Sequence, residues 1–122
     1  MREKHVNLIA YDDVENLNRF DDITFKTYCD AKINSCDKHI DFIKNNCIDE
    51  NNWTGRILEV GSGNSKLLYR MEREGLLAAG YGFEISASRY QFAEKFKKYV
   101  NSRRVKNIND NILTNGQMDR WI

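Results

Sequence analysis

The sequence contains no proline, two histidines, three cysteines and no long apolar run. With no proline and 7 glycines in 122 residues, nothing indicates a long disordered linker. The cysteines (Cys29, Cys36, Cys47) are odd in number and form no C-x-x-C pair. They therefore indicate free thiols in a reducing compartment, without a metal site. Because no apolar run approaches roughly 18 residues and no signal peptide is visible, we expect a soluble, cytoplasmic protein without membrane contact.

The net charge is also small, at +1, but the charged residues are unevenly distributed along the chain. Residues 1–50 carry 7 Lys and Arg against 11 Asp and Glu, and residues 51–122 carry 12 against 7. A basic cluster lies within residues 95–106, yet no nucleic-acid-binding motif surrounds it. We favour solvated helix faces over a nucleic-acid surface.

The first part of the chain, residues 1–52, reads as a helical segment. From Asp21 or Asp22 to about Asn46 the pattern predicts one long helix. Its apolar residues follow one another at intervals of 3 or 4 and form one stripe: Ile33, Cys36, Ile40, Ile43 and Cys47. We expect this helix to lie along the core.

Residues 53–122 alternate between strand and helix patterns. The first predicted element is a buried strand, Arg56–Val60, which ends in a glycine loop. The elements predicted after the loop are helix 65–74, strand 80–85, helix 86–100 and strand 104–108. This rhythm predicts right-handed crossovers and a Rossmann-like parallel sheet in the α/β class, with flanking helices. Residues 118–122 look like the start of a fourth strand, cut short. The outer edge of the first strand would then be open to an oligomer or a partner, and we expect a truncated domain.

The glycine loop after the first strand is the candidate ligand site. Gly61-Ser62-Gly63-Asn64-Ser65-Lys66 leads from a strand into a helix whose free N–H groups face the same place. A dinucleotide fingerprint, G-x-G-x-x-G, would have its third glycine where Lys66 stands. A lysine cannot replace the close packing of that glycine, and no P-loop string occurs.

Acidic residues stand at the ends of the three predicted strands. Glu59 precedes the loop, where it would repel a pyrophosphate and attract a cationic amino-acid moiety. Glu84 lies 21 residues after Gly63 and can accept both hydroxyls of an unphosphorylated ribose. Asp110 follows the third strand and could accept from an adenine amine. Together these acids suit a ligand with an adenine, a free ribose and a positive charge.

These residues resemble a known family. Glu59-Val60-Gly61-Ser62-Gly63-Asn64-Ser65 looks like motif I of the class I S-adenosylmethionine-dependent methyltransferases, with Ser65 where a third glycine often lies. The segment 80–86 is similar to the ribose-binding segment of the family, and 109–111 more weakly to its adenine-contact segment. The resemblance covers roughly residues 53–122. It implies that this stretch is the cofactor-binding half of such a domain, with S-adenosyl-L-methionine as its cofactor.

The resemblance also implies which residues contact the cofactor. They are Gly61, Ser62 and Gly63 at the methionine part, Glu84 with Ile85 at the ribose, and Asp110 and Asn111 at the adenine. We add Glu59 to these cofactor-binding residues because of its charge and its position just before the loop. We therefore expect methyl transfer to an unidentified acceptor, with a small molecule favoured, and no catalytic residue is marked. A non-catalytic methyltransferase-like binding or interaction domain and a NAD-dependent oxidoreductase remain the alternatives.

Overall fold

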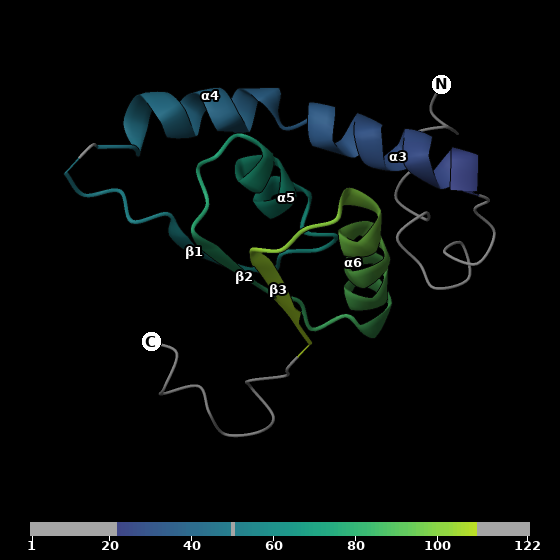
Figure 1. Ribbon diagram of the computed structural model, residues 1–122. Helices are drawn as coiled ribbons and strands as arrows, with labels where there is room; N and C mark the ends of the chain where they lie inside the picture. Colours follow the sequence, from purple (N-terminus) through teal and green to yellow (C-terminus); the bar gives the residue numbers. More distant parts are fainter. Residues whose placement is uncertain (1–21, 50, 110–122) are drawn as a thin grey trace, which may run out of the picture.

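The computed structural model describes residues 22–49 and 51–109 (Figure 1). Its elements, in order, are α3 (Asp22–Asn34), α4 (Asp37–Asn46), β1 (Arg56–Val60), α5 (Lys66–Arg73), β2 (Ala79–Phe83), α6 (Ala87–Val100) and β3 (Val105–Ile108). The strands form one parallel sheet in the order β1-β2-β3. The predicted α/β, Rossmann-like fold class is therefore confirmed. The expected fourth strand at residues 118–122 lies outside the described residues.

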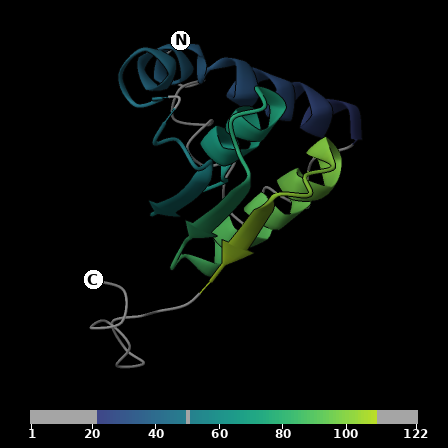
Figure 2. The same ribbon diagram turned by 60° about the vertical axis from the view of Figure 1, so that its left-hand side comes forward.

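All the described helices lie on one side of the sheet. Figures 1 and 2 show α5 and α6 beside the strands, with α3 and α4 stacked on α5. This arrangement follows from handedness: two successive right-handed crossovers that advance in one direction across a sheet place both helices on the same face. None of the described helices has the length and apolar character needed to cross a bilayer.

The core fills the space between the helices and the covered face of the sheet. Phe92 and Phe96 of α6 are completely buried, and Phe25 and Tyr28 of α3 pack against them. The ring centroids of Tyr28 and Phe92 are 5.1 Å apart, and those of Phe25 and Phe92 are 5.5 Å apart. This aromatic cluster attaches the N-terminal helices to the α/β unit.

The single long helix predicted for the N-terminal segment is wrong, because it is broken at Ser35 and Cys36. Arg70 of α5 accounts for the break: its Nη1 donates to the backbone oxygen of Ile33 at 2.9 Å and to Asp37 Oδ1 at 2.6 Å. One guanidinium thus donates hydrogen bonds to a carbonyl at the end of α3 and to the side chain of the first residue of α4. The apolar stripe survives as far as Ile43, which is partly buried against the core, whereas Cys47 is exposed.

Strand β1 is not buried, in contrast to the prediction. Leu58 is 50% exposed and Val60 is 74% exposed. The apolar sequence of the strand suits burial on both faces, but within the described residues helices cover one face only. The described sheet also places β1 at an edge.

Candidate functional site

The glycine loop joins the carboxyl end of β1 to α5. Gly61 and Gly63 have φ angles of +71° and +59°, a region that residues with a Cβ rarely adopt. The backbone N–H groups of Gly61 and Ser62 both donate to the carbonyl oxygen of Phe83, at 2.7 and 3.1 Å. The loop is therefore fixed to the end of the neighbouring strand.

Gly82 of β2 is essential to this packing. A Cβ at this position would lie 2.7 Å from Ser62 Oγ and 3.0 Å from Ser65 Oγ. The loop can therefore lie against the sheet only because residue 82 has no side chain. Sequence reasoning placed this glycine in a strand but assigned it no role at the site.

Ser65 begins α5 in the left-handed region, at φ 63°, and is completely buried. Its side chain makes no capping hydrogen bond to the helix. Asn64 does so, because its Oδ1 accepts from the N–H of Lys66 at 3.1 Å. Ser65 Oγ instead donates to Asn107 Oδ1 at 2.5 Å, and Asn107 Nδ2 donates to Tyr69 Oη and Glu94 Oε2, both at 2.9 Å. This buried network joins the loop to β3, α5 and α6.

Glu84, the predicted ribose acid, connects the loop to α6. Its Oε1 accepts from the N–H of Gly63 at 2.8 Å, and its Oε2 accepts from the N–H of Ser86 at 2.9 Å. The residue is 6% exposed. Ser86 caps α6, with its Oγ accepting from the N–H of Arg89 at 3.4 Å. Glu84 therefore orders the loop in addition to any contact it makes with a ligand.

Glu59 and Ser62 each present a buried oxygen without a partner. Within the described residues, neither Glu59 Oε1 nor Ser62 Oγ has a hydrogen-bond partner. Burial raises the pKa of the Glu59 carboxyl from 4.5 to about 7, and the charge of Lys66 partly opposes that rise. Buried oxygens without partners are costly, so this pair is a place where a ligand donor would be stabilised.

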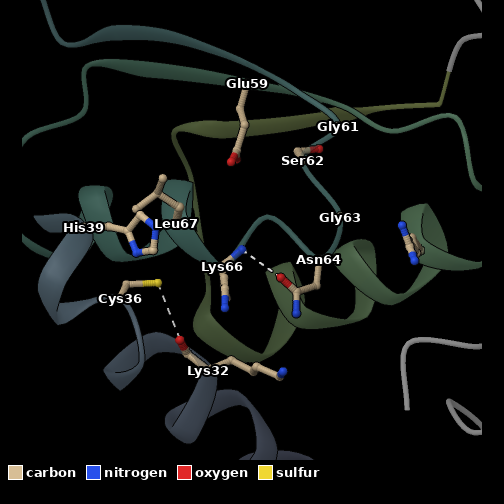
Figure 3. A pocket seen from close by; sticks show the side chains of 11 residues that line it. Lys32, Cys36, His39, Glu59, Gly61, Ser62, Gly63, Asn64, Lys66 and Leu67 are labelled. Atoms are coloured by element: carbon tan, nitrogen blue, oxygen red, sulfur yellow. Dashed lines mark hydrogen bonds between the residues drawn. The ribbon is translucent and has the colours of Figure 1, made fainter. Parts of the chain in front are cut away.

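Both residues line a pocket of about 310 Å³, into which the carboxyl group of Glu59 points (Figure 3). Its wall on the far side comes from the N-terminal helices, through Lys32, Cys36 and His39. Cys36 lies in the break between α3 and α4, with Lys32 and His39 on either side of it along the chain. Besides Glu59, the lining carries the cationic side chains of Lys32, Lys66 and Arg89. One carboxylate among several cations suits a ligand that bears both an ammonium and a carboxylate group.

The predicted site residues separate into three groups. Glu59, Gly61, Ser62 and Gly63 line the pocket together. Glu84 and Ile85 follow β2, with Glu84 directed at the loop and Ile85 65% exposed. Asp110 and Asn111 lie outside the described residues.

Several residues at the site were missed by the sequence reasoning. Asn107 had a usable signal, since it is a polar residue at an inward position of an apolar strand. The residues from the N-terminal helices, Lys32, Cys36 and His39, had none, because only tertiary packing brings them to the loop. Among the residues that the structure describes, no group of three or more His, Cys, Asp or Glu could hold a metal ion.

Comparison with known proteins supports the fold. No family model matches the chain, and no curated protein matches it. A solved structure that is similar to it is YjhP from E. coli, with a TM-score of 0.51 and 22% sequence identity. The match covers 62% of this chain and 29% of the YjhP chain. The likeness supports an α/β, Rossmann-like fold and leaves activity to the chemistry of the site.

Proposed function

We propose that this chain binds S-adenosyl-L-methionine and belongs to the machinery of methyl transfer to a small-molecule acceptor. The observation that carries the proposal is the pair of buried oxygens without partners, Glu59 Oε1 and Ser62 Oγ, beside the glycine loop. The ammonium group of the methionine moiety would supply the missing donors. When bound, the cofactor supplies a methyl group on a sulfonium, which is transferred in line to a nucleophile on the acceptor.

The charges around the pocket support the same ligand. Glu59 would hold the ammonium group, and Lys66, Lys32 and Arg89 line the same pocket and are available to the carboxylate. The sulfonium carries a positive charge, so a carboxylate at the end of β1 favours it. A nicotinamide dinucleotide is disfavoured by Lys66, which stands where the third glycine of its fingerprint would lie.

Glu84 can still serve a ribose while it holds the loop. An ionised carboxylate offers about four acceptor positions, and the N–H groups of Gly63 and Ser86 use two of them. Two positions remain for ribose hydroxyls at the carboxyl end of β2. The contribution of this chain is thus to bind and orient the methyl donor, because methyl transfer depends mainly on proximity and alignment.

Calorimetry with S-adenosylhomocysteine tests the proposal without turnover. We expect the wild-type chain to bind it and Glu59→Gln to bind it at least about tenfold more weakly, since a charge-assisted hydrogen bond is lost. Asp41→Asn, on the exposed face of α4, is the matched control and should bind as the wild type does. Absence of binding, or equal binding by wild type and Glu59→Gln, would refute the proposal.

One observation favours a second candidate, a non-catalytic domain that keeps the fold for interaction. Glu84 is 6% exposed and both its oxygens already accept backbone hydrogen bonds. A carboxylate used only to hold the loop needs no ribose. The same titration separates the two functions, because a non-catalytic domain of this kind would not bind S-adenosylhomocysteine. Addition of NAD in place of S-adenosylhomocysteine tests the oxidoreductase alternative, for which we expect no heat of binding.

A further inference from the structure

Ser65 has an unusual backbone conformation for its place in the chain. Among the residues that the structure describes, two that are not glycine have a positive φ: Ser65 at 63° and Asn101 at 56°. Asn101 ends α6, where a left-handed asparagine is a common helix stop. Ser65 instead precedes the first residue of α5, a place where an extended conformation is typical, as in Ser86 before α6. The conformation of Ser65 therefore costs free energy that its surroundings must supply.

This conformation sets the direction in which α5 leaves the glycine loop. The N–H of Ser65 donates to the carbonyl oxygen of Ser62 at 2.9 Å, and the carbonyl oxygen of Ser65 accepts from the N–H of Tyr69 at 3.1 Å. The first bond lies within the loop, and the second belongs to the first turn of α5. A different φ at Ser65 would therefore turn the loop relative to α5 and to the end of β2, where it is anchored.

The side chain of Ser65 is held by one residue of β3. Ser65 Oγ donates to Asn107 Oδ1 at 2.5 Å, and the two residues are 0% and 8% exposed. Ser65 does not line the pocket, so its hydroxyl group acts on the backbone that carries it and makes no contact with a ligand there. The amide nitrogen of Asn107 donates to Tyr69 Oη and Glu94 Oε2. These bonds orient the oxygen of Asn107 towards Ser65 before any ligand binds.

Neighbouring strands supply both the space and the acceptor for this hydroxyl group. Gly82 of β2 and Asn107 of β3 are partners in the sheet register. A Cβ at position 82 would lie 3.0 Å from Ser65 Oγ, so the missing side chain leaves the space. Ser65 stands where the motif that the loop resembles often has a glycine, a residue that adopts a positive φ freely. A serine at this place needs a partner to hold it, and Asn107 is that partner.

We propose that Asn107 is a positioning residue for the candidate cofactor site. By accepting from Ser65 Oγ, it stabilises the left-handed conformation of Ser65 and keeps the glycine loop in the shape that lines the pocket. A loop that has this shape for only part of the time binds its ligand proportionately more weakly. The effect on ligand affinity rests on the proposed binding of S-adenosyl-L-methionine, whereas the effect on the loop does not.

Two substitutions of Ser65 separate its backbone conformation from its hydrogen bond. Ser65→Ala and Ser65→Gly both remove the bond to Asn107, but alanine keeps a Cβ that disfavours a positive φ. The N–H of Gly63, which donates to Glu84, reports on the shape of the loop. It should exchange with solvent at least about threefold faster in Ser65→Ala than in Ser65→Gly. In calorimetry, Ser65→Ala should bind S-adenosylhomocysteine at least about threefold more weakly than Ser65→Gly. Equal exchange in the two variants overturns the proposal.

Asn107→Ala tests the positioning residue itself. It should speed exchange at Gly63 at least about threefold in the wild-type background, and less than about twofold in the Ser65→Gly background, where no strained residue needs a partner. Tyr69→Phe is the matched control, because it removes another hydrogen bond of Asn107 and leaves the one to Ser65 in place. Circular dichroism checks that each variant folds. Equal acceleration by Asn107→Ala in both backgrounds, or as large an acceleration by Tyr69→Phe, overturns the proposal.

The two measurements keep the positioning role apart from the proposed function. If exchange follows the expected pattern and no form of the chain binds S-adenosylhomocysteine, the proposed ligand is wrong and Asn107 still positions the loop. If the wild type binds and the two Ser65 variants bind equally, the positioning role is overturned and the proposed function stands.

Discussion

The N–H of Gly63 donates to Glu84 Oε1 at 2.8 Å, across the 21 residues that separate the glycine loop from the end of β2. The other oxygen, Oε2, accepts from the N–H of Ser86 at the start of α6. A single carboxylate therefore receives two backbone donors from two different segments. The position of the loop and the start of α6 therefore depend on the same side chain.

This relationship predicts the effect of Glu84→Gln. The amide presents one acceptor and one NH₂ group, so one of the two backbone donors must face another donor. We expect the free energy of unfolding to fall by roughly 1–3 kcal/mol, the cost of an unsatisfied buried polar group. Urea denaturation measures it, with Asp41→Asn on exposed α4 as the control that should leave the midpoint unchanged. Equal midpoints for Glu84→Gln and the wild type would mean that the loop does not depend on this carboxylate.

Gly82→Ala should displace the glycine loop from the sheet. The new methyl group would lie 2.7 Å from Ser62 Oγ and 3.0 Å from Ser65 Oγ, so the loop must move. We expect a loss of about 1–3 kcal/mol in the free energy of unfolding, typical of overpacking. Addition of Ser62→Gly removes the closest atoms, so the double variant should lose less than the sum of the single losses, by about 0.5 kcal/mol or more. Simple additivity in the denaturation data would argue against the contact.

Arg70→Lys should loosen the turn between α3 and α4. Lysine lacks the planar guanidinium group, so it cannot donate hydrogen bonds to Ile33 O, Asp37 and Glu74 at the same time, as Arg70 does. We expect a loss of about 1 kcal/mol of stability and faster hydrogen exchange at Ser35 and Cys36. S-adenosylhomocysteine should bind a few times more weakly, because this turn positions one wall of the pocket.

The control for this variant is Arg73→Lys, which changes an exposed residue of the same helix and should leave exchange at the turn as it was. If both variants exchange alike at Ser35 and Cys36, then Arg70 does not hold the turn.

The parts of the fold that local patterns determine were predictable from the sequence. Helix α6 begins after Ser86 and β1 spans Arg56–Val60, as predicted, because capping and hydrophobic periodicity act within a few residues. The glycine loop was recognisable for the same reason, since its φ angles demand glycine locally. That Glu59 and Glu84 lie near this loop could also be predicted, because both residues stand at the ends of strands.

What could not be predicted depends on residues distant in the sequence. The break between α3 and α4 is stabilised by Arg70, which lies 33 residues after Asp37. Asn34, Ser35 and Asp37 are weak helix formers, but the apolar stripe continues on both sides of them, so the local pattern reads as one helix. The exposure of Leu58 and Val60 likewise depends on what covers the sheet, and an apolar strand has the same sequence whether its second face is covered or open.

The pKa of Glu59 makes ligand binding depend on pH. Burial raises this pKa from 4.5 to about 7, so the free protein binds a proton below pH 7 that an ammonium ligand must displace. The affinity for S-adenosylhomocysteine should therefore rise by up to about tenfold per pH unit below pH 7 and level off above it. Calorimetry at pH 6 in two buffers of different protonation enthalpy should show close to one proton released per ligand bound, and almost none at pH 8.

Stability should depend on pH in the opposite sense. The folded chain retains the proton of Glu59 to higher pH than the unfolded chain does. The contribution of this group to the free energy of unfolding is therefore greatest below about pH 4.5 and is lost as the pH rises through about 7. Glu59→Gln has no proton to lose, so it should abolish both this component and the proton release on binding. If the variant released protons as the wild type does, another group would have to be their source. Glu59 would then not be the residue that meets the ammonium group.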